Sequence, residues 1–307
     1  MKVIVFGGTG WLGHNIVLQL AQTHHEVTVC CRGRKKTFLS EVSGLKMVTA
    51  DKKDAAAMKE ILAAGYDVVI DTVPTLESIA LVRKYAVGLK HYIHCSSTGG
   101  YAPLPFVPCN ETASYDGFEK TSGWMQKAYY DREVMRLFME CGFPATVIRP
   151  CYITGPGMLP LDNLGNRRED YIADVLAEKV LDVPDDGQAL LQPIHVIDLA
   201  TSFRLCVENT RSIGQIYNIC LDHAVPLWKY HELTAQALGR KANLNFMPLE
   251  EMVKKYEGKT GITDLRFVAT HMCLSIEKAK RDLGYKPHCT PEEAIQETAR
   301  WAASLLK

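Results

Sequence analysis

A glycine-rich segment near the start of the chain constrains the fold more than any other feature. Residues 7–13 read Gly-Gly-Thr-Gly-Trp-Leu-Gly and directly follow a short apolar run. Three of these glycines recur at every third position, a spacing that gives a tight turn, a close approach of backbone to a pyrophosphate, and close packing of a helix on a strand. The helix N-terminus that follows attracts phosphate. The residues expected to hold a dinucleotide here are Gly7, Gly8, Thr9, Gly10, Trp11, Leu12 and Gly13.

The first 95 residues alternate apolar runs with amphipathic patterns. This alternation predicts βα units, and such units require a parallel sheet with helices on both faces. The predicted class is therefore α/β, a doubly wound parallel sheet of the Rossmann type. We expect strands at 2–6, 26–31, 46–50, 67–71 and 91–95, and helices at 11–23, 54–64 and 77–87.

The remainder of the chain adds two predicted strands to this sheet and a second, smaller domain. The second domain is expected to be mainly helical and to bind the substrate. We place the dinucleotide-binding domain at 1–150 plus 189–222, and the substrate domain at 151–188 plus 223–307. The expected helices are 124–141, 168–180, 197–209 and 291–306, and the expected strands are 145–149 and 215–220.

Composition limits the partners. The 35 basic and 35 acidic residues give a net charge of zero, which does not favour binding to nucleic acid or to an anionic membrane. No apolar run approaches the roughly 20 residues that span a bilayer, and the early first strand leaves no room for a signal peptide.

The scattered cysteines indicate free thiols in a reducing compartment, so we expect a cytoplasmic protein. His91 and His94 point to opposite faces of a strand, and no metal site is expected.

The end of the second strand indicates which dinucleotide is bound. Dinucleotide sites for NAD usually carry an acid here that holds the ribose hydroxyls, whereas NADP sites use arginine. Residues 27–36 contain no acid, and they include Arg32, Arg34 and Lys35. An arginine fork matches the geometry of a phosphate. We therefore predict NADP, with NAD as the alternative.

Two further strand ends are predicted to contact the cofactor. Asp51 follows the third strand, where its carboxylate can reach the adenine amino group or cap a turn; the sequence favours neither. Thr72, Val73 and Pro74 follow the fourth strand and are expected to lie along the cofactor.

Several motifs along nearly the whole chain together resemble one family. The chain resembles the extended short-chain dehydrogenases/reductases of the NAD-dependent epimerase/dehydratase family. The segments that carry this resemblance are 7–13, 95–101 (Cys-Ser-Ser-Thr-Gly-Gly-Tyr), 149–157 (Arg-Pro-Cys-Tyr-Ile-Thr-Gly-Pro-Gly), 195–200 (His-Val-Ile-Asp-Leu-Ala) and 282–287 (Asp-Leu-Gly-Tyr-Lys-Pro).

The resemblance implies roles for residues after the fifth and sixth strands. It implies that Ser97 orients the reacting oxygen, with Thr98 beside it. It also places Cys95, Ser96, Pro150 and Tyr152 along the cofactor or the substrate pocket. A homodimer through helices of the central domain is usual for the family.

The chain departs from the family in its catalytic pair. The family uses Tyr-x-x-x-Lys, in which the tyrosine is the acid/base and the lysine holds the ribose and lowers the tyrosine pKa. No tyrosine of this chain is followed by lysine four residues later. One alignment places Lys127 at the lysine and Gly123 at the tyrosine; another places Tyr129 and Met125 there. The candidate replacement hydroxyls are Tyr101, Tyr115 and Tyr130, and we keep Lys127 and Tyr130 as catalytic candidates.

Four other residues have a functional and a structural interpretation. Arg167 and Arg168 can bind a diphosphate or can lie on the surface. His195 is expected to be a structural histidine that ties the insertion to the core, and Asp198 is expected to cap the helix that follows it.

The leading hypothesis is an NADP-dependent oxidoreductase or epimerase/dehydratase-type enzyme acting on a hydroxyl or carbonyl of a sugar-like or small polar substrate. The alternative is a dinucleotide-binding sensor or scaffold that has lost catalysis, which the missing Tyr-x-x-x-Lys pair favours. An RNA-associated member of the superfamily is a weaker third hypothesis because the net charge is zero.

Overall fold

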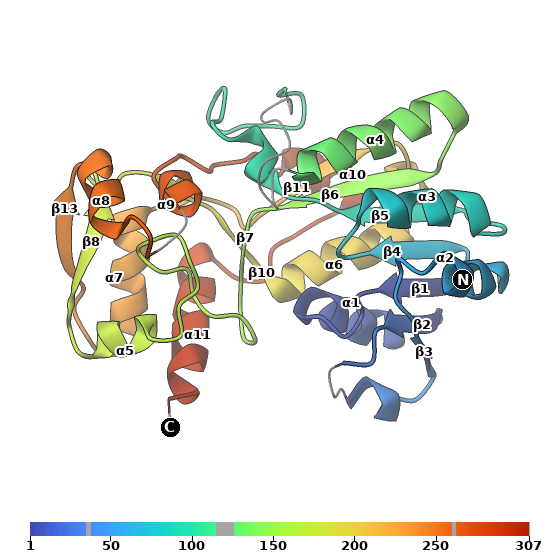
Figure 1. Ribbon diagram of the computed structural model, residues 1–307, viewed down its shortest axis with the longest axis horizontal. Helices are drawn as coiled ribbons and strands as arrows, with labels where there is room; N and C mark the ends of the chain where they lie inside the picture. Colours follow the sequence, from blue (N-terminus) through green and yellow to red (C-terminus); the bar gives the residue numbers. More distant parts are fainter. Residues whose placement is uncertain (35–37, 115–125, 260–261, 307) are drawn as a thin grey trace.

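A seven-stranded parallel sheet organises one half of the molecule (Figure 1). The computed structural model describes residues 1–34, 38–114, 126–259 and 262–306. The strand order is β11-β6-β5-β4-β1-β2-β3, and the order of the chain reverses between β1 and β4. The strands are β1 (Lys2–Phe6), β2 (Glu26–Cys31), β3 (Leu45–Thr49), β4 (Val68–Asp71), β5 (His91–Cys95), β6 (Ala145–Pro150) and β11 (Ile216–Ile219).

Helices cover both faces of this sheet, as the alternating pattern predicted. On one face α1 packs against α6, and their apolar side chains join those of the strands in the largest core cluster. On the other face α2, α3 and α4 enclose a second cluster. The helices are α1 (Trp11–Ala21), α2 (Ala55–Ala63), α3 (Leu76–Tyr85), α4 (Gln126–Cys141) and α6 (Val196–Val207).

The glycine-rich turn joins β1 to α1 in a shape that only glycine permits. Gly7 has a φ of +76°, and a Cβ atom there would lie 2.5 Å from the Thr72 hydroxyl oxygen. A Cβ atom on Gly13 would lie 2.2 Å from the Gly7 carbonyl oxygen. The helix therefore sits directly on the turn, and its N-terminus faces the carboxyl edge of the sheet.

The other half of the molecule is built around helices, as expected, with short two-stranded sheets beside them (Figure 1). Its cores form where α7, α8, α9 and α11 meet, and where α5 meets α7 and α11. The elements are α5 (Tyr171–Leu176), α7 (Leu227–Ala237), α8 (Leu249–Tyr256), α9 (Ile262–Val268), α11 (Pro291–Ser304), β8 (Val180–Pro184), β9 (Leu190–Leu191), β12 (Val225–Pro226) and β13 (Asn243–Met247).

The helix predicted at 168–180 is longer than the helix in the structure. Helix α5 ends at Leu176, Glu178 adopts a φ of +51°, and the chain then enters β8. Residues of β8 pair with β13 from a distant part of the chain. This long-range pairing overrides the local helical pattern.

The proposed domain boundaries remain a prediction, and the structure adds one detail to them. Helix α10 (Glu277–Leu283) follows α9 in sequence, yet it contacts β11 and α6 of the sheet. Two strands, β7 (Tyr152–Thr154) and β10 (Pro193–His195), pair with each other where the chain passes between the two halves. Among the described residues, no helix is both long and apolar enough to cross a membrane.

Candidate active site

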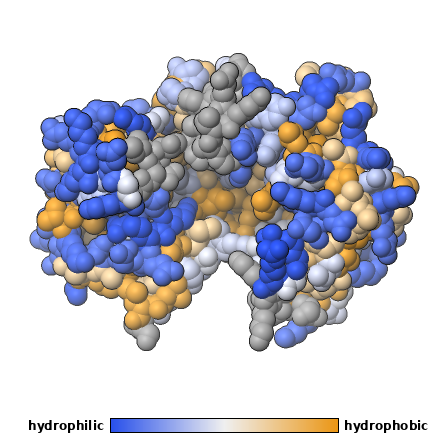
Figure 2. All heavy atoms as spheres, in the orientation of Figure 1, coloured by the Kyte–Doolittle hydropathy of each residue, from blue (hydrophilic) through white to orange (hydrophobic). Residues whose placement is uncertain are grey.

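A cleft of about 680 Å³ runs along the carboxyl edge of β1, β2, β3 and β4. In folds of this kind ligands bind where the strand order reverses, and the reversal here lies between β1 and β4. Figure 2 shows that the molecule is hollowed between its two halves, with apolar residues at the bottom of the hollow. The predicted cofactor residues that line the cleft are Gly7, Thr9, Gly10, Arg32, Arg34, Asp51 and Val73.

The turn at one end of the cleft has the form of a pyrophosphate cradle. Gly8, Leu12 and Gly13 are buried behind it and pack on the sheet. Thr72 is buried and donates a hydrogen bond from its hydroxyl to the Phe6 carbonyl (2.9 Å), which fixes the start of the turn. Gly7, Thr9 and Gly10 line the cleft, so this part of the turn is within reach of a ligand there.

Trp11 connects this turn to the other half of the molecule. Its indole N–H donates to the Pro156 carbonyl at 2.6 Å, and a Cβ atom on Gly157 would lie 2.6 Å from the indole ring. The side chain therefore positions the loop after β7 over the turn. A direct contact of Trp11 with a cofactor remains a prediction.

The cleft is basic beside the end of β2. Arg32 and Arg34 are exposed at the end of β2, and no hydrogen bond or ion pair of either side chain is found within the described part of the chain. Lys35 lies outside the described residues. Asp51 uses one carboxylate oxygen to accept the N–H of Lys53 (3.0 Å), so the turn-capping interpretation holds for that oxygen, while the residue still lines the cleft.

Lys52 is a cleft residue that the sequence analysis missed. Its ammonium lies 2.7 Å from Asp71 Oδ1 and also contacts the Val73 carbonyl. It therefore spans the cleft from the end of β3 to the end of β4. The sequence gives little indication of this role, because two adjacent lysines in a turn, Lys52 and Lys53, are typical of an exposed surface.

Replacing Arg32 with alanine is expected to weaken NADPH binding by about 1.5–3 kcal/mol, roughly 10- to 150-fold, because a charge-assisted hydrogen bond to the 2′-phosphate is lost. NADH binding should change little. Dissociation constants from cofactor fluorescence would measure both, with Arg83→Ala on α3 as a control outside the cleft. An equal loss for the two cofactors would refute the phosphate role.

The other end of the site lies at the ends of β5 and β6. Lys127, near the start of α4, donates from its ammonium to the Ser96 carbonyl at 3.4 Å. Ser97 accepts the Gly99 N–H (3.2 Å), and Thr98 donates to the Pro150 carbonyl (3.3 Å). These contacts bring Ser96, Thr98, Lys127 and Pro150 together, with Ser97 between Ser96 and Thr98 in the chain.

The structure places the two candidates for the family lysine differently. Lys127 is half-buried and reaches β5, whereas the Tyr129 side chain is exposed. The position four residues before Lys127 is Gly123, which lies outside the described residues. Cys95, at the end of β5, is a buried thiol whose pKa burial raises to about 11, so it is uncharged at neutral pH.

The two candidate tyrosines in the described part of the chain each use the hydroxyl in a hydrogen bond. Tyr101 is buried, and its hydroxyl accepts from Arg149 (2.5 Å) and donates to Asn218 (3.1 Å). Burial raises the pKa of Tyr101 to about 12, against the opposing effect of Arg149. The Tyr130 hydroxyl pairs with Gln126 at 3.2 Å, and its ring packs against the core between α2, α3 and α4. Tyr115 lies outside the described residues.

A buried polar network lies directly behind this end of the site. The Asp131 carboxylate, one turn after Lys127, lies 2.9 Å from Arg149 Nε and 3.1 Å from His94 Nε2. Burial opposes ionisation of Asp131, but the His94 hydrogen bond and the Arg149 charge hold its pKa below the usual value. His91, in contrast, contacts the Thr146 hydroxyl (2.7 Å), so the two histidines do point to different partners. The network fixes α4 against β5 and β6.

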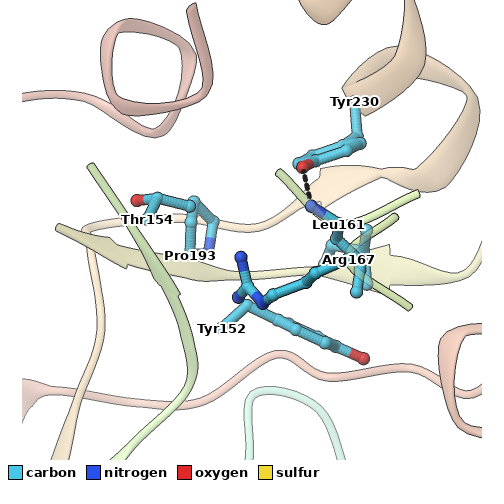
Figure 3. A pocket seen from close by; sticks show the side chains of 7 residues that line it. Tyr152, Thr154, Leu161, Arg167, Pro193 and Tyr230 are labelled. Atoms are coloured by element: carbon cyan, nitrogen blue, oxygen red, sulfur yellow. Dashed lines mark hydrogen bonds between the residues drawn. The ribbon is translucent and has the colours of Figure 1, made fainter. Parts of the chain in front are cut away.

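Arg167 and Arg168 both have structural partners. Arg168 is ion-paired with Asp162 at 2.7 Å. Arg167 donates to the carbonyls of Ile153 (2.8 Å) and Leu159, and lines a cavity of only about 10 Å³ with Tyr152 and Tyr230 (Figure 3). A cavity of this size holds about one water molecule, so it does not admit a diphosphate.

The prediction for His195 agrees with the structure, and the one for Asp198 is wrong. His195 is buried and is itself the N-cap of α6, accepting the Ile197 N–H (3.3 Å), and its Nε2 atom lies 3.2 Å from Glu297 on α11. Asp198 sits in the first turn and instead accepts from the backbone N–H of His288 (3.0 Å). The cap position was misjudged because His195 has extended backbone angles and a suitably placed ring nitrogen.

The fold and the cleft define a Rossmann-type dinucleotide-binding protein with a second lobe. A sequence profile of the "NAD dependent epimerase/dehydratase family" matches residues 3–79 and 72–220. The chain belongs to this family of NAD(P)-dependent epimerases, dehydratases and reductases.

The individual relatives have low sequence identity to this chain. The chain is 28% identical to the chloroplast stem-loop binding protein of 41 kDa b of Arabidopsis thaliana, over 97% of this chain and 78% of that protein. It is 24% identical to 2′-dehydrokanamycin reductase of Streptomyces kanamyceticus, over 84% of this chain and 72% of that protein. The structure of UDP-glucose 4-epimerase of Bifidobacterium longum in complex with NAD⁺ and UDP shares the fold, with a TM-score of 0.75, 18% identity, and 99% and 98% of the two chains covered.

Proposed function

We propose that this chain is an NADP-dependent oxidoreductase or epimerase/dehydratase-type enzyme acting on a hydroxyl or carbonyl of a sugar-like or other small polar substrate. The observation that carries the proposal is the cleft, in which a cradle of glycines meets two exposed arginines at the end of β2. The fold neighbour in complex with NAD⁺ and UDP supports the cofactor class and a nucleotide-linked substrate. NAD remains the alternative cofactor.

We expect the residues of the cleft to hold a dinucleotide. Gly7 and Gly10 line the cleft where we expect the pyrophosphate, and Arg32 lines it where we expect the 2′-phosphate. Lys127 places a positive charge beside β5, where it can hold the nicotinamide ribose. A bound nicotinamide supplies or accepts the hydride.

The chain itself orients the substrate and moves the proton. Ser97 is half-buried between Ser96 and Thr98, where its hydroxyl can orient the reacting oxygen. The positive charge of Lys127 stabilises a developing oxyanion nearby. The Tyr101 hydroxyl pairs with Arg149 and Asn218, and the Tyr130 hydroxyl pairs with Gln126, so we assign the proton transfer to water or to another residue.

Replacing Ser97 with alanine is expected to lower turnover at least about 100-fold, the usual effect of removing a hydrogen-bonding group that acts on a developing oxyanion. NADPH consumption would be measured against aldehydes, ketones and nucleotide sugars. Ser97→Thr keeps a hydroxyl and should retain part of the activity, and Ser97→Ala should leave NADPH affinity unchanged. Unchanged turnover in Ser97→Ala would remove Ser97 from the mechanism. Tight NADPH binding without turnover on any substrate would favour a sensor.

A second candidate function is binding to structured RNA. One observation favours it, the 28% identity over 97% of this chain with a protein named for stem-loop binding. The zero net charge argues against a broad electrostatic footprint, so any such binding would be local. A gel-shift titration with a stem-loop RNA, with and without NADPH, would test it, and absence of a shift at micromolar protein would reject it.

A further inference from the structure

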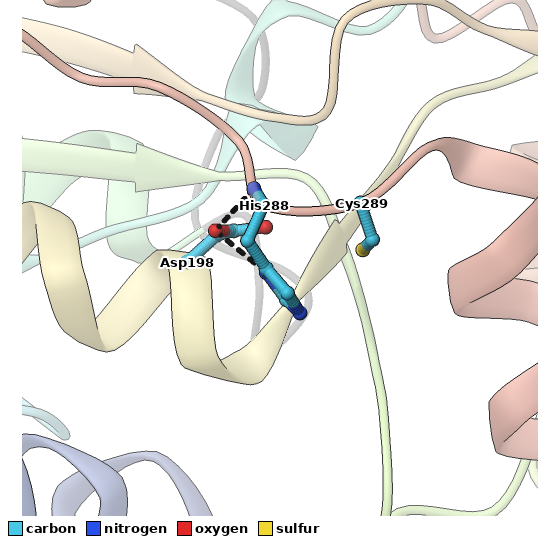
Figure 4. A group of neighbouring side chains, drawn as sticks. All are labelled: Asp198, His288 and Cys289. Carbon is cyan, nitrogen blue, oxygen red and sulfur yellow. Dashed lines mark hydrogen bonds and ion pairs between the residues drawn. The ribbon is translucent and has the colours of Figure 1, made fainter.

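Three side chains with metal-binding atoms meet where the sheet half contacts the segment before α11. Asp198 comes from the first turn of α6, and His288 and Cys289 come from the loop between α10 and α11 (Figure 4). One ligand atom from each lies within 4.8 Å of the other two. The three donors differ in type, namely a carboxylate oxygen, an imidazole nitrogen and a sulfur.

One oxygen of Asp198 has no hydrogen-bond partner in the described chain. The residue is 2% exposed, and its Oδ1 atom accepts the backbone N–H of His288 (3.0 Å) and lies 2.9 Å from His288 Nδ1. Its Oδ2 atom is buried and has no partner among the described residues. In Figure 4 this second oxygen lies on the side of Asp198 that faces Cys289. A buried carboxylate oxygen without a partner is costly, and a bound cation would satisfy it.

Acidic side chains lie close to the three donors. Glu297 lies beside His195, whose ring meets the His288 ring edge-on at 4.7 Å between centroids. The carboxylates of Asp198, Glu293 and Glu297 all lie close enough to Cys289 to act on its thiol.

We infer that Asp198, His288 and Cys289 form a divalent metal site whose best match is Zn²⁺. Sulfur, nitrogen and oxygen together are the donor set of zinc, whereas calcium and magnesium bind oxygen alone. Tetrahedral Zn²⁺ holds its ligand atoms about 3.3–3.8 Å apart, so small side-chain rotations close the observed spacing. The half-exposed His288 side leaves room for water as a fourth ligand.

Binding at this site is balanced by the loss of a proton. Cys289 binds as a thiolate and releases its proton to solvent. His288 presents Nδ1 to the metal as a neutral imidazole, so a proton on Nδ1 that faces Asp198 Oδ1 moves to Nε2 or to solvent, while the backbone hydrogen bond to Asp198 is kept. The metal would thus join α6 to the loop that leads into α11. The inference does not depend on the reaction proposed above.

Cobalt titration tests the site directly. Protein freed of metal with a chelator would be titrated with Co²⁺, and a thiolate-to-cobalt absorption band should appear with one equivalent. Zn²⁺ should abolish the band by displacement. Cys289→Ser should lose it, whereas Cys141→Ser, which removes an exposed thiol on α4, should keep it. No band in the wild type, or a band that survives Cys289→Ser, would overturn the inference.

Thermal unfolding gives a second readout that does not rely on thiol absorption. A ligand that binds only the folded chain raises the midpoint temperature. Excess Zn²⁺ should raise Tm by several degrees in the wild type and in Cys141→Ser, and should leave Cys289→Ser unchanged. An equal rise in Cys289→Ser would show that Zn²⁺ acts elsewhere and would also contradict the site.

Discussion

Replacing Gly13 with alanine is expected to weaken NADPH binding at least roughly 100-fold and to lower the free energy of unfolding by about 3 kcal/mol. The new methyl group would lie 2.2 Å from the Gly7 carbonyl oxygen and 2.8 Å from the Gly8 Cα atom. Both neighbours are backbone, so they cannot rotate away. The helix must instead move off the turn, which distorts the cradle that receives the pyrophosphate.

A matched variant separates this effect from general strain. Gly239→Ala also introduces a methyl group, but no atom lies within 4 Å of it and only the φ of +68° is unfavourable. We expect it to cost about 1–2 kcal/mol and to leave NADPH affinity intact. Urea unfolding and cofactor fluorescence would measure both quantities. Gly13→Ala that binds NADPH within threefold of wild type would show that the turn does not hold the cofactor.

Replacing Arg149 with methionine is expected to destabilise the chain by about 3–5 kcal/mol, because it leaves the Asp131 carboxylate buried without its cation. Both side chains are at most 3% exposed. Arg149→Met also removes the donor to the Tyr101 hydroxyl. Urea unfolding would measure the loss. Arg136→Met, which breaks exposed pairs on α4, the helix that carries Asp131, should change stability too little to resolve.

The same network predicts a pH dependence with a definite sign. The pKa of Asp131 is lowered in the folded chain, so the stability that its charge contributes is present above the unfolded pKa of about 3.9. It is lost as the pH falls through the lower folded pKa. The difference in unfolding free energy between wild type and Asp131→Asn should therefore shrink as the pH falls below about 4. A difference that grows with acidity would contradict the assignment.

The sheet half could be predicted from the sequence because its signals are local. Apolar runs fixed β2 and β5 to the residue, and the Asp54 side chain caps α2 as expected. The structure of the second half was harder to predict from the sequence. Strand β8 exists because residues around Val183 pair with β13, a partner more than 50 residues away, and no local pattern reports such a pairing.

In the candidate site, too, local motifs could be predicted from the sequence and long-range contacts could not. The glycine turn, Arg32 and Ser97 are visible as motifs at strand ends. Lys52 and Asp131 were missed because their importance comes from neighbours that are distant in sequence, Asp71 and Arg149. The different placement of Lys127 and Tyr129 depends on how α4 lies against the end of β5, which a single helical pattern cannot supply.

A crystal structure of the chain with NADP⁺ tests the central claim most directly, that this cleft holds the phosphorylated dinucleotide. We expect the pyrophosphate on the turn that begins at Gly7 and the 2′-phosphate within hydrogen-bond distance, about 3 Å, of Arg32. The nicotinamide should lie beside Ser97 and Lys127. A 2′-phosphate that faces solvent away from Arg32, or a dinucleotide bound outside the cleft, would contradict the claim.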